Sequence, residues 1–461
     1  MSLDLLHQHT TIKHGMNNTF SHDAQYLAQL KAVEQLIKSK QLQEAAQQLN
    51  LLAKTDAHDP RPFLLGSLLA EAVGNPDGML QAARKAHELA PQWHFASIHL
   101  AGVLASRGDA EDAVLMAERA IQQALFQELD QVELLTKAAA VARRLMLHPQ
   151  ALHWLRQAEQ ISPGDLSIQH QIAHALIASG DAQDAIDILT ELLDQLPDQP
   201  TLLRDRLRAC LSAGRKEQAI EDGEALIAMD AGNEVYRYYL DIARGEIPST
   251  QPSALVSELF DDFAARYDRY WMGQMQYQLP SEVARLIGQW HPDRKGDVLD
   301  LGCGTGLLGA SLGPIEGVLV GVDLSAKMIE QAARHHVYDR FHHVNVLDAL
   351  QATPAGLYHV ITALDVLIYV GNLDDVIPNA HRILVPGGRL VFSCEAAAEG
   401  AADYALPSSS YRYTHQRSYV QRLLLAAGFE EVDIQDRTLR VEAGQPVEGF
   451  LVTARKPLQA L

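Results

Sequence analysis

A period of 34 residues in the first half of the chain constrains its fold more than any other feature. Six turn markers are separated by steps of 34, 34, 38, 34 and 34 residues. The markers are Lys40, Gly74, Gly108, Met146, Gly180 and Gly214. Small or apolar residues follow each marker after five and after twelve positions, as Ala113 and Ala120 follow Gly108. A fixed period of this size indicates stacked copies of one supersecondary unit.

Each unit is expected to be two helices joined by a turn at the marker. Glycine permits the positive φ that ends a helix, and proline cannot continue one. Prolines stand seventeen residues after three of the markers, at Pro91, Pro163 and Pro197. The pattern resembles the tetratricopeptide repeat, whose period is about 34 residues. The resemblance covers six units over residues 23–232, with four extra residues near 121–133. The alternative is an all-α bundle with coincidental spacing.

Such repeats stack into a superhelix, and this resemblance implies a concave face that binds a protein or peptide partner. Residues 233–246 are predicted to form a capping helix, so the helical repeats occupy 23–246. A polar, disordered lead-in is expected over 1–22, and the Pro- and Ser-containing segment 247–253 is predicted to be a linker.

The pattern changes after the linker, and residues 254–461 are predicted to form an α/β domain. Short β-rich runs alternate with helical stretches, which implies parallel strands joined by crossovers. The runs span 297–302, 317–324, 342–350, 357–370 and 387–395. Two further strands in succession near the end predict an antiparallel edge. The expected fold is therefore an all-α superhelix followed by a Rossmann-like, mostly parallel sheet.

The stretch 298-VLDLGCGTGLLG-309 places glycines at every second position after an apolar run. Its last part also fits G-x-G-x-x-G, the dinucleotide-binding pattern, which is weak by itself. Ligands of open α/β sheets bind at the carboxyl ends of the strands, and there four runs carry an acid. These acids are Asp300, Asp323, Asp348 and Asp365. A negative rim repels a pyrophosphate and favours an ammonium or sulfonium, so a dehydrogenase is the more distant alternative.

The motif from Asp300 to Gly306 resembles motif I of the class I S-adenosylmethionine-dependent methyltransferases, and the resemblance extends over about 255–456. It implies S-adenosylmethionine as cofactor. Asp323, next to Leu324, would bind both ribose hydroxyls, and Asp348 would contact the adenine amino group. Asp365 would lie near the methionine end. The cofactor residues implied by the resemblance are Asp300, Gly302, Cys303, Gly304, Gly306, Asp323, Leu324, Asp348, Ala349, Asp365 and Tyr267.

Aromatic residues Phe260, Phe263 and Tyr267 share one face of a predicted helix before the first strand. One interpretation is an amphipathic helix that packs on the sheet. The other is a lid that places Tyr267 over the sulfonium. With Tyr277 and Pro280, this opening is similar to that of a bacterial group of predicted methyltransferases that carry tetratricopeptide repeats.

Candidate catalytic residues are Arg412, His415 and Asp365. Arg412 and His415 follow the fifth predicted strand, where this fold builds its acceptor side. Arg412 would hold an anionic group and His415 would take a proton, or both would only cap a helix. Asp365 would be a general base, an ion-pair partner or a cofactor contact. Methyl transfer needs alignment more than acid–base groups, so the lack of an obvious triad does not argue against an enzyme.

Composition excludes some partners. A formal charge of −20 argues against a nucleic-acid partner, and three widely spaced cysteines show no metal or disulfide pattern and fit a cytoplasmic protein. No metal site and no membrane span are expected. The predicted function is methyl transfer to a protein side chain or a small or carrier-bound acceptor, with the repeats recruiting a protein. The alternative is a non-catalytic repeat scaffold with a vestigial cofactor domain.

Overall fold

The computed structural model describes residues 23–127, 129, 131–268, 272–273, 275–408, 410–442 and 444–458. The predicted lead-in over 1–22 lies outside these residues. Contacts divide the chain between Pro197 and Asp198 into two compact units. The predicted boundaries at 246 and 254 stay predictions. In the described residues, no helix combines the length and the apolar character that crossing a membrane requires.

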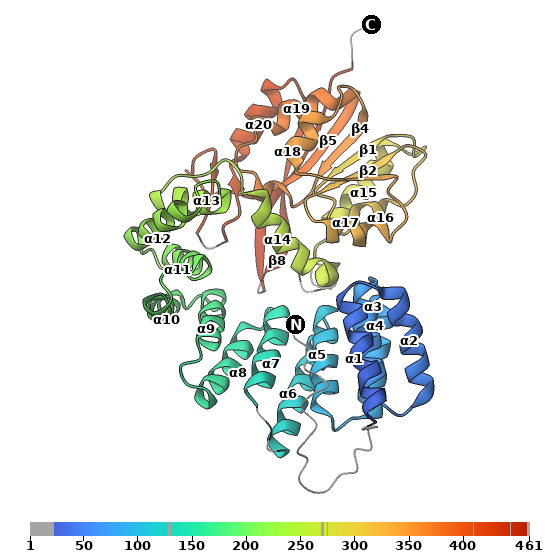
Figure 1. The fold of residues 1–461 in the computed structure, drawn as a ribbon. Coiled ribbons are helices and arrows are strands. Elements are labelled where there is room, and N and C mark those ends of the chain that lie inside the picture. Colours follow the sequence, from blue (N-terminus) through green and yellow to red (C-terminus); the bar gives the residue numbers. More distant parts are fainter. Residues whose placement is uncertain are drawn as a thin grey trace. The chain divides into compact units, whose positions relative to one another are not determined.

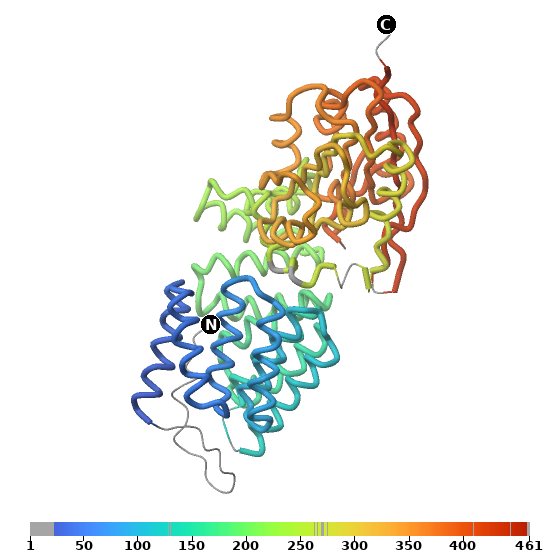
Figure 2. Tube along the Cα trace, turned by 90° about the vertical axis from the view of Figure 1, so that its right-hand side faces the viewer, coloured from blue at the N-terminus to red at the C-terminus, as the bar shows by residue number. Residues whose placement is uncertain are grey.

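The first unit consists of antiparallel helix pairs (Figures 1 and 2). Its helices are α1 Ala24–Lys38, α2 Leu42–Thr55, α3 Arg61–Ala72, α4 Pro76–Leu89, α5 His94–Ser106, α6 Ala110–Phe126, α7 Val132–Arg144, α8 His148–Ile161, α9 Leu166–Ser179 and α10 Ala182–Gln195. The four extra residues fall at the end of α6, which is the longest described helix with 17 residues. Pro91, Pro163 and Pro197 each stand two residues after the end of a helix, as the sequence predicts.

All six turn markers adopt positive φ, including the two that are not glycine. The angles are 59° for Lys40, 68° for Gly74, 77° for Gly108, 60° for Met146, 90° for Gly180 and 71° for Gly214. The residues five and twelve positions after every marker are buried, from Ala45 and Leu52 to Ala219 and Leu226. The period therefore reflects a left-handed turn followed by two buried positions on the second helix.

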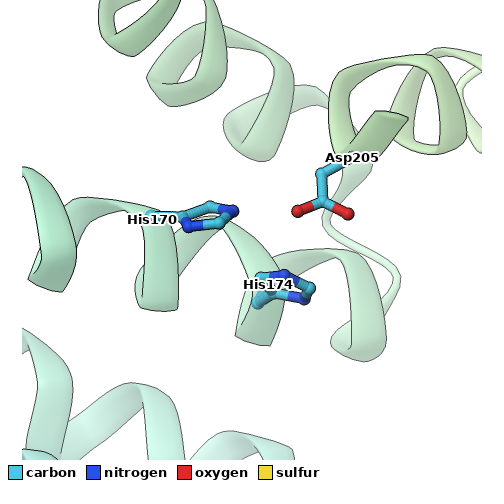
Figure 3. A group of neighbouring side chains, drawn as sticks. All are labelled: His170, His174 and Asp205. Atoms are coloured by element: carbon cyan, nitrogen blue, oxygen red, sulfur yellow. The ribbon is translucent and has the colours of Figure 1, made fainter. Parts of the chain in front are cut away.

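Two histidines of the first unit lie one turn apart on α9. The ring centroids of His170 and His174 are 5.0 Å apart, with the planes tilted by 50° (Figure 3). Asp205, drawn in the same figure, is a buried residue of α11 in the second unit.

The second unit begins with the last helices of the repeat pattern and continues into the α/β domain. These helices are α11 Pro200–Ser212, α12 Lys216–Met229 and α13 Glu234–Arg244, the predicted capping helix. α14 Ser253–Phe263 and the short 3₁₀ helix η1 Ala264–Arg266 follow. The segment between α13 and α14 is bonded to the domain, because Thr250 forms an antiparallel bridge with Val370.

The strands are β1 Val298–Leu301, β2 Leu319–Asp323, β3 Arg340–His343, β4 Tyr358–Ala363, β5 Leu384–Ala396, β6 Tyr404–Ala405, β7 Thr414–His415, β8 Glu430–Glu442 and β9 Gln445–Arg455. The parallel order is β3-β2-β1-β4-β5, and β9 pairs antiparallel with β5 and β8. The mostly parallel sheet with an antiparallel edge is confirmed. It has nine strands in the described residues, not seven, because the two-residue strands β6 and β7 add to it.

Helices cover both faces of this sheet. α18 Val346–Ala352, α19 Val376–Ile383 and α20 Arg417–Ala426 supply apolar residues to the core on one face. α15 Leu279–Trp290 and α16 Leu307–Leu312 pack in the core on the other face. α17 Ala326–Ala333 follows β2, and the short 3₁₀ helix η3 Leu367–Tyr369 follows β4.

Two of the predicted β-rich runs are wrong in their second halves. In 357–370, β4 ends at Ala363 and η3 follows at Leu367–Tyr369. Residues 342–350 were expected to be a single strand, but β3 ends at His343 and α18 begins at Val346. Asn345 explains the change, because its Oδ1 accepts a hydrogen bond of 2.8 Å from the backbone N–H of Asp348. A side-chain oxygen at this place caps a helix.

Candidate functional site

A cavity of about 490 Å³ opens at the carboxyl ends of β1, β2 and β4, within the second unit. It is lined by residues that follow these strands, by the first turn of α18, by α14 and by α13. Phe260 lines it, and so do seven of the cofactor residues implied by the resemblance. They are Tyr267, Gly302, Gly304, Asp323, Leu324, Asp348 and Asp365.

Asp323 lies at the end of β2, beside the glycine loop. Its Oδ2 accepts a hydrogen bond of 2.8 Å from the N–H of Gly304, and its Oδ1 accepts one of 2.8 Å from the N–H of Ser325. Burial raises the pKa of the carboxyl, while these backbone amides act to lower it. Each oxygen keeps a lone pair for a further donor, so Asp323 can bind two hydroxyl groups of a ligand in the cavity.

Gly304 leaves open space where a side chain would stand. Its φ is +54°, and a Cβ placed there would meet no atom within 4 Å. Because Gly304 lines the cavity, a ligand can approach the main chain at this point. Gly306 has a different role: its φ of 84° turns the chain into α16, and a Cβ there would press on Ala332.

Asp300 does not face the cavity in the way that the sequence suggested. It is 3% exposed, and its carboxylate accepts hydrogen bonds from Tyr338 Oη at 2.7 Å and Thr362 Oγ1 at 2.8 Å. Burial raises the pKa of Asp300 to about 6. Cys303 is also buried, and its sulfur lies where a Cβ of Gly321 on β2 would stand.

Asp348 and Ala349 lie on α18, and they face different surroundings. Asp348 is exposed at the first turn of the helix, where it lines the cavity together with Leu347. Ala349 packs in the core beneath it.

Asp365 is an ion-pair partner, which is one of the roles expected of it, in a buried network whose other members the sequence did not reveal. Its φ is +56°, and both of its oxygens accept hydrogen bonds from Arg440 Nη1, at 2.9 and 2.8 Å. Arg440 lies on β8, is 1% exposed, and also binds Glu395 and Glu442. Burial raises the pKa of Asp365, and the Arg440 guanidinium opposes this rise. Nothing in the strand pattern around Arg440 marks it as the partner of a residue 75 positions earlier.

Arg412 and His415 do not come together in the cavity. The guanidinium of Arg412 binds Glu395 at 2.8 Å and Glu442 at 2.7 Å. His415 is fully buried, and its Nε2 donates to the carbonyls of Val370 and Gly371 at 3.1 and 3.0 Å. Burial lowers the pKa of His415 to about 4, so the imidazole is neutral.

The segment before β1 contributes to the lining of the cavity. Tyr267 lines it, and the rings of Phe260 and Phe263 lie 6.3 and 6.0 Å from the Tyr267 ring. Two carboxylates fasten this segment to the sheet domain. Ser325 Oγ donates to Asp261 at 2.5 Å, and Thr305 Oγ1 donates to Asp268. Asp268 belongs to the opening that resembles other methyltransferases, but the sequence predicted this role for neither acid.

Comparison with known proteins agrees with this geometry. Residues 271–434 match the family described as methyltransferase domain, and residues 148–204 and 176–238 match the tetratricopeptide repeat. The ubiquinone biosynthesis O-methyltransferase of Thiobacillus denitrificans is 26% identical over 222 residues, which are 42% of this chain and 95% of that protein. Its counterpart in Xanthomonas oryzae pv. oryzae is 26% identical over 205 residues, covering 41% of this chain and 85% of that protein.

Among solved structures, the N-methyltransferase NodS of Bradyrhizobium japonicum is 18% identical with a TM-score of 0.34. The match covers 44% of this chain and 98% of NodS. The sequence-based recognition is confirmed: the chain carries tetratricopeptide repeats and a methyltransferase domain.

Proposed function

We propose that the cavity binds S-adenosylmethionine through Asp323 at the ribose, Asp348 and Leu347 at the adenine, and Gly302 and Gly304 at the methionine part. The observation that carries this proposal is the Asp323–Gly304 pair. It combines an acceptor for two hydroxyl groups with an open approach to the main chain. The ligand has no phosphate, which suits a cavity lined by Asp323, Asp348 and Asp365.

Tyr267 is proposed to cover the sulfonium. Its ring belongs to a cluster of aromatic rings at the cavity, and an electron-rich aromatic face attracts a cation. Burial and the neighbouring Asp365 raise the pKa of Tyr267, so its hydroxyl stays neutral.

When bound, the cofactor would supply a methyl group activated by the sulfonium: an acceptor atom would bond to the methyl carbon in line, and the sulfur would leave with the electron pair of the broken bond. The protein has to align the two partners and exclude water. Asp365 is proposed to position the reacting groups at its end of the cavity, since Arg440 holds the carboxylate of Asp365 in one orientation.

His415 and Arg412 are proposed to act as positioning residues. His415 binds the carbonyls of the segment that follows η3, and Val370 of that segment lines the cavity. Arg412 shares Glu395 with Arg440 and so supports the network around Asp365.

The acceptor is proposed to be a small or carrier-bound molecule or a protein side chain. The relatives named as O-methyltransferases support an oxygen as the methylated atom. The tetratricopeptide repeats are proposed to recruit a protein partner that carries or delivers this acceptor, by analogy with the use of such repeats elsewhere.

Isothermal titration calorimetry tests the cofactor site. The full chain is titrated with S-adenosylmethionine, S-adenosylhomocysteine and NADH, and the measurement is repeated with Asp323→Ala and with Asp293→Ala, which removes an exposed acid. A hydrogen bond to a charged group contributes about 1.5–3 kcal/mol, so Asp323→Ala should weaken binding at least tenfold. An unchanged Kd would remove Asp323 from the site, and binding of NADH alone would overturn the proposal. No binding of any of the three would favour a non-catalytic scaffold.

A further inference from the structure

The last helix of the repeat pattern forms one wall of the methyl-transfer cavity. α13 contributes Glu234, Arg237, Tyr238 and Asp241 to the lining. These positions are spaced by three, one and three residues, so they share one face of the helix. Glu234 and Arg237 are exposed, whereas Tyr238 is 4% exposed. We call these four residues the entrance wall.

The entrance wall is anchored from two sides within the second unit. Behind it, Leu240 of α13 packs so closely on Gly223 of α12 that a Cβ on Gly223 would lie 3.0 Å from a Leu240 methyl group. After it, Ser249 accepts hydrogen bonds of 2.9 and 3.0 Å from the backbone N–H groups of Gly371 and Asn372.

A side chain of the α/β domain adds to this second anchor. The hydroxyl of the fully buried Tyr413 donates a hydrogen bond of 2.7 Å to the carbonyl of Pro248. α13 therefore has a defined place beside the cavity.

The charges of the entrance wall favour a cation. Two carboxylates, Glu234 and Asp241, stand against one guanidinium, Arg237, which donates a hydrogen bond of 2.9 Å to the carbonyl of Ala231. The rest of the lining adds Asp323, Asp348 and Asp365, of which Asp365 is paired with Arg440, and no Lys or Arg other than Arg237 lines the cavity among the described residues. The potential in such a cleft attracts positive ligands.

We propose that the entrance wall selects by charge between the methyl donor and the spent product. This inference rests on the proposed function. S-adenosylmethionine carries a sulfonium, an ammonium and a carboxylate, so its net charge is +1. When the methyl group leaves with the acceptor, the sulfur keeps the electron pair of the broken bond and becomes a neutral thioether. The product is a zwitterion of net charge zero, and the wall attracts it less. The repeat region thereby takes part in donor binding and product release.

The test measures the Kd of both ligands by calorimetry on the full chain at low and at high salt. Glu234→Gln combined with Asp241→Asn should raise the Kd of S-adenosylmethionine roughly threefold to fivefold at about 10 mM salt and leave that of S-adenosylhomocysteine unchanged. Arg237→Gln should shift the ratio of the two Kd values in the opposite direction. Both effects should shrink at about 0.5 M salt.

Matched controls come from the last residue of α13 and from exposed acids near it in the chain. Glu221→Gln combined with Glu246→Gln removes two carboxylates, and Arg244→Gln removes one guanidinium, at exposed positions outside the cavity lining. If they shift the ratio as much as the wall variants, the effect belongs to the net charge of the protein, and the proposal is overturned. Equal changes in both ligands would also overturn it, since they indicate altered packing. Failure of the wild type to bind either ligand would instead refute the proposed function itself.

Discussion

The helical repeats and the methyltransferase sheet position their important residues in different ways. In the repeats, a marker at positive φ and the two buried positions that follow it lie within twelve residues of one another. In the sheet domain, the carboxylate of Asp365 accepts hydrogen bonds from Arg440, 75 residues later, and Arg440 also binds Glu395. A local pattern repeats visibly along the sequence, whereas a buried ion pair between distant strands leaves no such trace.

The two regions also differ in what holds them together. Alanines at fully buried positions bring the paired helices close, so the packing at these positions is apolar and forms between neighbours in the chain. The buried ion pair of the first unit, Arg61–Asp59, also joins residues only two positions apart. The sheet domain instead buries charged groups around its cavity, and each charge is costly unless its partner is present. We therefore expect single substitutions to have large effects around Asp365 and small effects at the turn markers of the repeats.

The largest effect is expected from Arg440→Met. It leaves the carboxylates of Asp365 and Glu395 buried without their main cation, which should lower the free energy of unfolding by about 3–5 kcal/mol. Scanning calorimetry would follow the unfolding transition whose midpoint temperature changes when S-adenosylmethionine is added. Arg437→Met, on the same strand, is the control, because its pair with Glu282 is partly exposed and is worth about 0–1 kcal/mol. Equal losses of unfolding free energy in the two variants would contradict the expected difference between the buried and the partly exposed ion pair.

Asp300 should make stability depend on pH. Its folded pKa of about 6 lies above the usual 3.8, so its contribution is complete below pH 3.8 and is lost as the pH rises through 6. The loss amounts to about 3 kcal/mol. Between about pH 4 and pH 7, the unfolding free energy of the wild type should therefore fall by about 3 kcal/mol relative to that of Asp300→Asn. A difference that stays constant over this range would show that the folded pKa is not raised.

Thr305→Val tests how the segment before β1 is fastened. Thr305 is buried, and its hydroxyl donates to Asp268, a hydrogen bond to a charged group worth about 1.5–3 kcal/mol. Hydrogen exchange of residues 253–268 should accelerate in Thr305→Val, while Thr305→Ser should restore the wild-type rate. If Thr305→Ser exchanges as fast as Thr305→Val, the hydroxyl does not fasten the segment.

The smallest effect is expected in the repeats. Met146 occupies a turn with a φ of 60°, where the other markers are mostly glycine. Met146→Gly should relieve backbone strain and stabilise the first unit by up to about 1 kcal/mol, measured by chemical denaturation. Gly180→Ala, with a φ of 90° and no atom near the new methyl group, should destabilise it by about the same amount. A loss of stability in Met146→Gly would mean that its side chain contributes more than the turn.

Much of the fold could be predicted because its signals are local. The helix–turn–helix period, the capping helix over 233–246 and the alternation of strands and helices all follow from neighbouring residues. The strand expected over 342–350 was wrong because that prediction also relied on a local signal. Apolar residues suggested a continuous strand, while the cap formed by Asn345 starts a helix there. The placement of Asp323 and Gly304 followed from the motif, whereas the environments of Asp300, Arg412 and His415 did not.

By itself, the sequence determined the repeated helix pairs, the class of the sheet domain and the glycine loop after β1, because each depends on residues close together in the chain. The tertiary structure alone decided which acids face the cavity, which are neutralised by arginines, and that α13 lines the cavity wall. These features depend on distances between segments separated by tens of residues. The free energy of a buried charge is set by its neighbours in space, and one sequence read along its length does not contain them.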